Sequence, residues 1–409
     1  MSTDFITFIL KLPPQSRNFV AENVLVITLP RKHQTCPHCG SSHNHVHDYR
    51  VQTLRGIHAP LTYQYNRRRY RCQDCGKAFN EENSFLSRYQ RMPDSIIEAI
   101  IEDHKELASG AQIAHRYDVS APTVMRHFAR ATEKMHSDET STELADVLSI
   151  DEFRGNVGAK YQVVVNDLKA RHCCAILKDR SMQILYDVFL SYPQEKREQI
   201  QLVSMDLSAF FRKLIEECFP NAIIAADKFH ALRLANDALD AIRKDVQKTL
   251  DVSARKSFKN ARRILLARKH TLQGQSLEKL NDILSVSDDL KKAHQLKEEY
   301  FELFSSTDHA DYKKRLQDFA AHVAEFGLKE FKRVLRTTYQ WQEEIWNGIR
   351  TGYNNGFTEG CNNTIKALKR VCYGFRNIEN FKRRILFILN NPARQERRTK
   401  NLKKVPHNT

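Results

Sequence analysis

Two acidic residues stand in the middle of an apolar stretch of the chain, Val147–Phe153 (VLSIDEF). A carboxylate in a buried strand is costly unless a cation meets it, so Asp151 and Glu152 need a partner. Side chains alternate along a strand, so only one of the two acids faces a given site. The alternative interpretation is a strand-end acid that reaches water. Acids elsewhere in the chain favour a site.

Two more acids compete for the place beside Asp151, and a third lies near the end of the chain. Asp206 and Asp227 each end an apolar run, in SMD and AADKFH. Glu359 lies where a loop rich in glycine and asparagine runs into a helix. Four polar residues share one face of that helix: Glu359, Asn363, Lys366 and Arg370. This pattern alone is typical of an amphipathic surface helix, but the glycines beside Glu359 and the basic residues beyond it favour a site.

Three carboxylates that meet in one pocket need a cation. At 4 Å each pair repels by about 4 kcal/mol at an effective dielectric constant near 20. Hard oxygen ligands with open positions suit Mg²⁺ or Mn²⁺, which keep waters and bind phosphate. Two such ions would activate the attacking oxygen and stabilise the leaving oxygen during in-line displacement at a phosphodiester.

Four of the nine cysteines form two CxxC pairs, each followed by glycine. They are Cys36, Cys39, Cys72 and Cys75. Each tight turn aims two sulfurs at one ion, so the spacing predicts a tetrahedral Zn²⁺ site that holds a small module together and is not catalytic. Beside the second pair, a basic run suits contact with phosphate. The run includes Arg67, Arg68 and Arg69.

A helix-turn-helix is predicted after Pro93. Isoleucines recur there at helical spacing up to Ser109-Gly110. Next, Ile113, Ala114, Tyr117 and Val119 lead to Ser120, which with Pro122 begins the second helix of the motif. The turn between them lacks glycine, so Asp118 or its neighbour must adopt the left-handed conformation. The second helix would enter the DNA major groove. Its outward residues would be Thr123, Arg126, His127 and Arg130. A helix hairpin packed on the next domain is the alternative.

The central part of the chain predicts one mixed sheet. The predicted strands are 147–153, 161–168, 172–179, 200–206 and 222–229, with helices at 182–192 and 209–219. Three meandering strands followed by two helix–strand crossovers describe the ribonuclease H-like fold, with the fourth strand parallel beside the first. This order brings Asp151 and Asp206 to the same part of the sheet, whereas Asp227 lies one strand further out. We therefore prefer Asp206 as the second acid.

Charge and hydropathy indicate a partner and a compartment. The chain carries 65 Lys and Arg against 49 Asp and Glu, a formal charge of +16. From Gly360 onward there are 13 basic and two acidic residues. This excess favours a polyanion, although a basic tail alone would also suit RNA or an acidic membrane. No apolar run is long enough to span a membrane, and the N-terminus lacks the charge pattern of a signal peptide. We expect a cytoplasmic protein.

Together these motifs resemble the bacterial insertion-sequence transposases with an Asp-Asp-Glu site, of the ISL-three type. The resemblance covers nearly the whole chain. It rests on the CxxC pairs, the helix-turn-helix, and the segments SIDEF, SMD, ADKFH and TEGCNN with the basic residues that follow. It implies that Asp151, Asp206 and Glu359 hold the catalytic Mg²⁺ or Mn²⁺ ions. It also implies cleavage at terminal inverted repeats and joining of the freed 3′-hydroxyls to target DNA.

The predicted architecture is a multidomain α/β chain. We expect a zinc-ribbon DNA-binding domain at 1–90, a helix-turn-helix at 91–140, and the first part of the ribonuclease H-like core, a mixed five-stranded sheet with helices, at 141–230. An all-α insertion at 231–349 and the last part of the core, with the Glu-bearing helix and a basic tail, at 350–409 complete the chain.

The expected partners are double-stranded DNA and a second copy of the chain, because each DNA end needs a catalyst. In a bacterial cell such a protein would be associated with the nucleoid. Two alternatives are an inactive, transposase-derived DNA-binding regulator and a structure-selective nuclease of the same fold.

Overall fold

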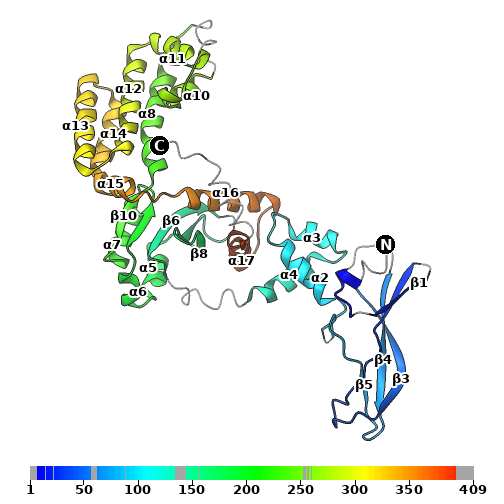
Figure 1. The fold of residues 1–409 in the computed structure, drawn as a ribbon. Helices are drawn as coiled ribbons and strands as arrows, with labels where there is room; N and C mark the ends of the chain where they lie inside the picture. Colours follow the sequence, from blue (N-terminus) through cyan, green and yellow to red (C-terminus); the bar gives the residue numbers. More distant parts are fainter. Residues whose placement is uncertain are drawn as a thin grey trace. The chain divides into compact units, whose positions relative to one another are not determined.

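The computed structural model describes residues 7–392 except 14, 22, 57–61, 88, 134–143, 156, 252–254, 256, 257 and 259. Residues 393–409 of the predicted basic tail lie outside the described residues. The chain divides into two compact units, residues 1–138 with 365–409, and residues 139–364 (Figure 1). Residues 365–392 therefore group with the N-terminal part of the chain.

The first unit is built on a five-stranded sheet. Its strands are β1 (Arg17–Ala21), β2 (Val24–Thr28), β3 (Asn44–Thr53), β4 (Thr62–Cys72) and β5 (Ala78–Asn80). They run in the order β1-β2-β4-β3, and β5 pairs with β4. Strand β4 alternates, so that Tyr63 and Tyr65 are buried against the helices while Thr62 is exposed.

Three helices follow this sheet: α2 (Asp94–Asp103), α3 (Gly110–Arg116) and α4 (Ala121–Ala131). Ser109 begins α3 with a capping box to Gln112. Between α3 and α4, Asp118 has a φ of 50°, which confirms the predicted left-handed residue. Val124 and Phe128 form the buried side of α4.

A helix from the far end of the chain completes this layer. In α17 (Ile378–Leu389), Arg384 is 3% exposed and its Nη2 donates to the carbonyls of Glu106 and Ala108, at 2.9 and 2.7 Å. Its neighbour Phe387 packs edge-on against Phe128, with ring centroids 5.4 Å apart. Arg384 therefore has a structural role, because it donates hydrogen bonds to two backbone carbonyls in the loop between α2 and α3.

The second unit contains a mixed sheet with strand order β10-β9-β6-β7-β8. Its strands are β6 (Val147–Arg154), β7 (Tyr161–Asp167), β8 (His172–Leu177), β9 (Leu202–Met205) and β10 (Ile223–Ala226). Strands β6, β7 and β8 pair antiparallel, while β9 is parallel to both β6 and β10. The predicted placement of the fourth strand beside the first is confirmed. Helices α5 (Met182–Leu190), α6 (Gln194–Glu198) and α7 (Ala209–Cys218) connect these strands.

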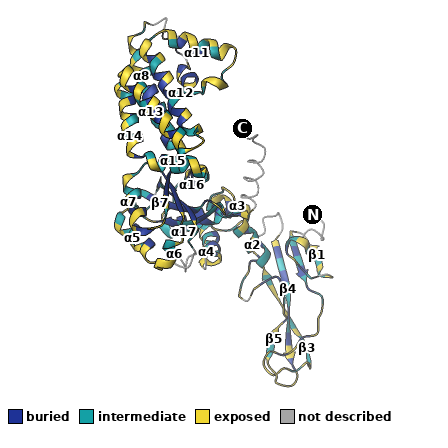
Figure 2. Ribbon diagram, turned by 60° about the vertical axis from the view of Figure 1, so that its left-hand side comes forward, coloured by how far each residue is buried: buried dark blue, intermediate teal, exposed yellow. Residues whose placement is uncertain are grey.

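The predicted helical insertion consists of helices joined by loops and contains no strand among its described residues. It contains α8 (Lys228–Thr249), α10 (Ala261–Leu266), α11 (Gln275–Ser285), α12 (Asp288–Glu302), α13 (His309–Phe326), α14 (Lys329–Gln340) and α15 (Gln342–Thr351), and α16 (Gly356–Val371) follows it. One continuous cluster of buried side chains joins these helices to the sheet, whose strands are mostly buried in Figure 2. Trp341 is 3% exposed and Trp346 stacks on Tyr312, so both tryptophans serve packing, as expected.

One predicted strand is too long. The sequence favoured a strand to Phe229, but β10 ends at Ala226 and α8 begins at Lys228. The reason is that Asp227 caps α8, because its side chain accepts a hydrogen bond from the backbone N–H of His230. Aspartate is a better helix start than a strand residue.

Helix α15 packs against β10, which is an edge strand of the sheet. Asn347 donates from Nδ2 to the carbonyl of Ile224 at 2.9 Å, which occupies an edge group that would otherwise face water. Gly348 lies so close that a Cβ there would stand 2.5 Å from the carbonyl oxygen of Ala226. This contact therefore needs a glycine in the helix.

We expect Gly348→Ala to lower the free energy of unfolding by about 1–3 kcal/mol, since the methyl group overpacks a backbone contact. The better helix propensity of alanine offsets about 1 kcal/mol at most. Thermal unfolding followed by circular dichroism measures this. In the matched control Gly110→Ala the new Cβ meets Met125 Sδ at an ordinary 3.5 Å. Equal stability of both variants would contradict the prediction.

Candidate functional site

Asp151 lies on β6, and Asp206 directly follows the last residue of the neighbouring parallel strand β9. In the register of these two strands, Ser149 on β6 pairs with Ser204 on β9. Each acid follows its serine by two residues, so both lie on the same face of the sheet as the serines. Burial, together with the charge of Asp206, raises the pKa of Asp151 to about 6. Burial also raises the pKa of Asp206. Burial therefore makes both carboxyl groups harder to ionise, although the charge of His230 lowers both pKa values.

Three side chains anchor α16 on this face of the sheet. Just before the helix, the Oδ1 of Asn355 accepts from the hydroxyl of Ser204 at 2.8 Å. One turn later, Thr358 Oγ1 lies 2.5 Å from the Ser149 hydroxyl. It also accepts from Asn166 on β7 at 3.0 Å. The helix is thereby fixed to β6, β7 and β9 at once.

The third anchor touches the candidate site itself. Asn362 is 7% exposed, and its Nδ2 donates to Asp151 Oδ2 at 2.8 Å. The other oxygen of Asp151 accepts from the backbone N–H of Glu152 at 2.8 Å. These two bonds fix the plane of the Asp151 carboxylate. The buried Oδ1 of Asn362 has no hydrogen-bond partner among the described residues.

Glu359 lies on α16 between Thr358 and Asn362, and its side chain is exposed. The polar face predicted for this helix is also exposed at Asn363, Lys366 and Arg370, while Cys361, Ile365 and Leu368 are buried. In the described part of the chain, the only group of three or more His, Cys, Asp and Glu ligand atoms within 4.8 Å of one another is the four cysteines. The structure thus brings the helix of Glu359 onto Asp151, while the Glu359 carboxylate does not join the two aspartates at that distance.

The two candidates for the second acid differ in what their oxygens contact. Asp227 Oδ1 accepts from the backbone N–H of Asn355 at 3.0 Å, and Oδ2 lies 2.8 Å from His230 Nδ1. Although burial alone would raise it, the pKa of Asp227 is lowered because His230 and Asn355 donate to the carboxylate. By contrast, Asp206 Oδ1 is buried and has no hydrogen-bond partner among the described residues.

His230 lies beside these acidic residues, in contact with Asp227. The hydrogen bond with Asp227 raises the pKa of His230, and the charges of Asp206 and Asp151 act in the same direction. Sequence reasoning noted the ADKFH segment but assigned no role to its histidine. A His three residues after an N-capping Asp was the available signal, because the first turn of a helix brings the two side chains together.

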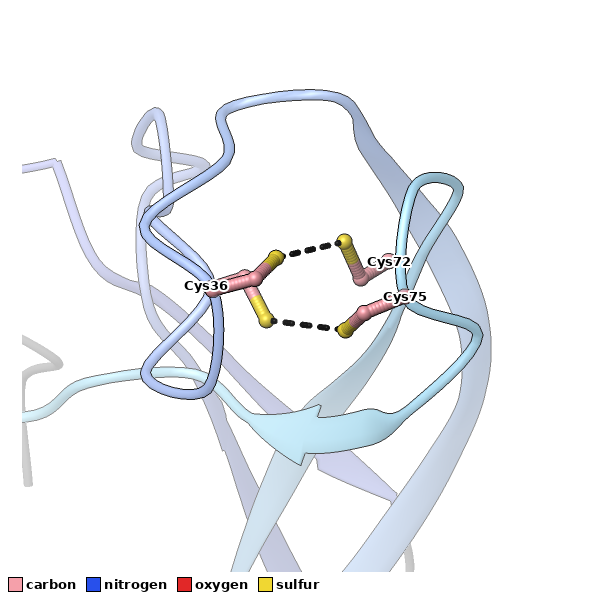
Figure 3. Close-up of side chains that lie close together, drawn as sticks. Cys36, Cys72 and Cys75 are labelled. Atoms are coloured by element: carbon pink, nitrogen blue, oxygen red, sulfur yellow. Dashed lines mark hydrogen bonds between the residues drawn. The ribbon is translucent and has the colours of Figure 1, made fainter.

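The four cysteines form the second candidate site (Figure 3). Sγ of Cys36 lies 3.7 Å from that of Cys75, and Sγ of Cys39 lies 3.6 Å from that of Cys72. Four sulfurs around one Zn²⁺ at about 2.3 Å stand about 3.8 Å apart, so the spacing fits that ion. Backbone N–H groups of Cys75 and Asp74 lower the pKa of Cys72 to about 7, which favours its thiolate. Although a backbone hydrogen bond at Ser41 lowers it, burial and the neighbouring cysteines raise the pKa of Cys39 to about 12, so a cation is needed to hold all four sulfurs as thiolates.

The two CxxC turns, or knuckles, Cys36–Gly40 and Cys72–Gly76, have the same backbone conformation. The N–H of Gly40 donates to the carbonyl of Cys36 at 2.9 Å, and that of Gly76 to Cys72 at 3.1 Å. Gly40 and Gly76 have φ of 74° and 67°, which explains why glycine follows each CxxC pair.

Of the arginines predicted to contact DNA beside the knuckle, one is used by the fold. Arg68 is 8% exposed, and its guanidinium donates to Glu81 at 2.9 Å and to the carbonyl of Leu29 at 2.8 Å. Arg67 and Arg69 lie on the opposite, partly exposed face of β4. In α4, Arg126 and Arg130 are exposed and Thr123 and His127 are partly exposed, as expected of the outward side.

Comparison with known proteins decides the family. Residues 148–385, which include both aspartates, Glu359 and the helices between them, match the ISL3 family of DDE transposases, described as "Transposase". The chain belongs to the ISL3 family of DDE transposases.

Individual relatives agree with the family assignment. The chain is 26% identical over 355 residues to the transposase for insertion sequence element IS1001 of Bordetella parapertussis, which is 85% of this chain and 86% of that protein. It is 23% identical over 253 residues to the transposase for insertion sequence element IS1557 of Mycobacterium tuberculosis, covering 56% and 57% of the two chains. A shorter match, 32% over 105 residues, links a quarter of this ISL3-family chain to a Lactococcus lactis protein named ATP-dependent protease.

None of the described helices of this family member is long and apolar enough to cross a membrane.

Proposed function

We propose that this protein is a DNA transposase that binds the terminal inverted repeats of its insertion sequence and catalyses metal-dependent strand cleavage and strand transfer. One observation carries the proposal: Asp151 on β6 and Asp206 at the end of the parallel strand β9 each follow a register-paired serine by two residues, and α16, which donates to Asp151 through Asn362, bears a third acid. The strand order supports a ribonuclease H-like core. Family membership supports the reaction class.

A divalent cation fits the aspartates. Asp206 Oδ1 and Asn362 Oδ1 are buried oxygens without hydrogen-bond partners among the described residues, and hard oxygen donors suit Mg²⁺ or Mn²⁺. We propose Asp151, Asp206 and Glu359 as the residues that hold it, with Asp227 as a positioning residue. Such an ion would supply charge stabilisation at the scissile phosphate. The chain's own part is to hold the carboxylates in register and, through Asn362 and Glu152, to orient Asp151.

The first unit is proposed to bind the DNA ends. The α4 residues Thr123, Arg126 and Arg130 are placed to enter a major groove, Arg67 and Arg69 to contact phosphate, and the exposed α16 residues Asn363, Lys366 and Arg370 to hold DNA near Glu359. A homodimer on DNA and a place in the bacterial cytoplasm follow from this function.

The test is cleavage of supercoiled plasmid carrying the insertion sequence with both its ends. With purified protein and Mg²⁺ we expect nicks at the element's termini that expose 3′-hydroxyls, followed by joined products, and no reaction in EDTA. Cutting that ignores the terminal repeats and never rejoins strands would favour a nuclease of the same fold. Binding without any cutting would favour a regulator.

Replacing Asn362 by Leu should lower the rate of strand cleavage about 10–100-fold while leaving the chain folded. Leucine has a similar volume but cannot donate to Asp151 Oδ2, and loss of a group that orients a metal ligand typically costs this much. Cleavage rate as a function of Mn²⁺ concentration separates weaker metal binding from slower chemistry. Asn221→Leu is the control, because Asn221 Nδ2 donates to the carbonyl of Glu198 at the surface. Wild-type cleavage by Asn362→Leu would refute the orienting role.

A further inference from the structure

A polar groove of about 980 Å³ lies in the first unit, between the β3–β4 ribbon and the loop before α2. Its lining includes Arg50 and Gln52 of β3, Arg67 of β4, and Tyr89 and Arg91 of the loop. Arg50 and Arg91 are exposed, and Tyr89 is 89% exposed. None of the functions argued above uses Arg50, Arg91 or Tyr89.

Two of these arginines form a like-charge pair across the ribbon. Arg50 stands directly opposite Arg67 in the antiparallel register of β3 and β4. Like charges directly opposite each other destabilise a pair of strands. Two residues along, the next pair on the same face is Asp48 opposite Arg69, which carries opposite charges and forms an ion pair at 3.4 Å. Arg69 thus has an acidic partner across the ribbon, whereas Arg50 and Arg67 stand opposite each other and line the groove.

The carboxylates around the groove do not compensate the pair. Glu81 is 3% exposed and both its oxygens are occupied, by the Tyr65 hydroxyl and the Arg68 N–H at Oε1 and by the Arg68 guanidinium at Oε2. Arg67 donates to the backbone carbonyl of Glu81, at 3.1 Å, and not to its carboxylate. Glu82 is one exposed carboxylate on the rim, against the three guanidiniums of Arg50, Arg67 and Arg91.

We propose that this groove binds the sugar-phosphate backbone of duplex DNA, with Arg50 and Arg91 as direct phosphate contacts and Arg67 behind them. A phosphate between Arg50 and Arg67 turns a repulsive pair into two charge-assisted hydrogen bonds. Because phosphate contacts carry no base information, the groove adds affinity and fixes orientation, while sequence is read elsewhere. The inference rests on the proposed function and names a new contact surface for the same DNA.

The test measures binding of the full-length protein to a short mixed-sequence duplex by fluorescence anisotropy at several salt concentrations. Each phosphate contact contributes about 0.9 to the slope of log K against log salt. We expect Arg50→Ala and Arg91→Ala each to reduce that slope by about 1, so that the affinity gap to wild type narrows about fourfold between 50 and 200 mM salt. Lys213→Ala on α7 removes one positive charge elsewhere and should leave the slope unchanged.

A second variant separates binding from folding. Arg50→Glu places opposite charges across β3 and β4, so it should raise the thermal unfolding temperature of the protein while weakening DNA binding more than Arg50→Ala does. A variant that binds poorly because it is misfolded would instead unfold at a lower temperature.

Three results would overturn the inference. If wild type binds DNA and the Arg50 and Arg91 variants keep its salt slope, the groove is not a contact and the proposed function still stands. If these variants change the oligomeric state measured by light scattering but not the slope, the groove receives an acidic segment of a second copy. If wild type binds no DNA at all, the proposed function fails with it.

Discussion

Asp206→Asn is expected to reduce Mg²⁺-dependent strand cleavage at least about a thousandfold, which corresponds to about 4 kcal/mol of transition-state stabilisation. The variant replaces a buried carboxylate oxygen that has no hydrogen-bond partner among the described residues, and with it the charge that would hold a divalent ion. Asp227→Asn should reduce cleavage only about tenfold. An asparagine there retains an acceptor for the Asn355 N–H, while it loses the charge that faces His230.

The measurement pairs single-turnover cleavage with calorimetric titration of Mn²⁺ into the protein. Asp206→Asn should lose both cleavage and Mn²⁺ binding, whereas Asp227→Asn should keep Mn²⁺ binding. The second acid would have to be reassigned if Asp227→Asn lost the metal and Asp206→Asn kept it. Circular dichroism of both variants confirms that they are folded.

Removal of zinc is expected to unfold the end of the β3–β4 ribbon and leave the rest of the first unit intact. The side chains packed around the knuckles form a small cluster of their own, Cys36, Tyr70, Cys72 and Phe79, too small to be stable alone. Zinc binding in such modules supplies about 10–16 kcal/mol. The larger core around Tyr63, Tyr65 and the helices does not involve the metal.

Metal analysis should find one zinc per chain in wild type and none in Cys72→Ser. Hydrogen exchange of that variant should be faster in residues 36–46 and 70–80 and unchanged in α2 and α4. Cys174→Ser is the matched control, since Cys174 lies outside the cysteine cluster. Uniform acceleration across the first unit would show that the metal supports the whole unit.

The sequence was most informative where one local rule decides the structure. The strand order of the second unit followed from a meander and two crossovers, and it brought Asp151 beside Asp206. The left-handed residue at Asp118 followed from a turn without glycine. The exposed face of α16 followed from its spacing. Each rule acts over a few residues or one connection.

The parts that could not be predicted depend on partners distant in the chain. Arg68 and Arg384 look like surface cations in the sequence, but carbonyls and a carboxylate from other segments take them into the interior. Asn355, Thr358 and Asn362 read as ordinary loop and helix residues. The available signal was a polar residue on the apolar side of a helix, since buried polar groups are rarely left without partners. Which strand supplies the partner follows only from the fold.

The hydrogen bonds that anchor α16 on the sheet also determine when, during synthesis, the site around Asp151 becomes complete. Asn362 and Asp151 are 211 residues apart, Thr358 and Ser149 are 209 apart, and Asn355 and Ser204 are 151 apart. Contacts at such separation form only after the intervening loop has closed, at the expense of chain entropy. A polypeptide that stops within the helical insertion therefore has its sheet and both aspartates but lacks Asn362, one of the two donors that orient Asp151. Under the proposed function, we therefore expect prematurely ended translation to yield fragments without cleavage activity.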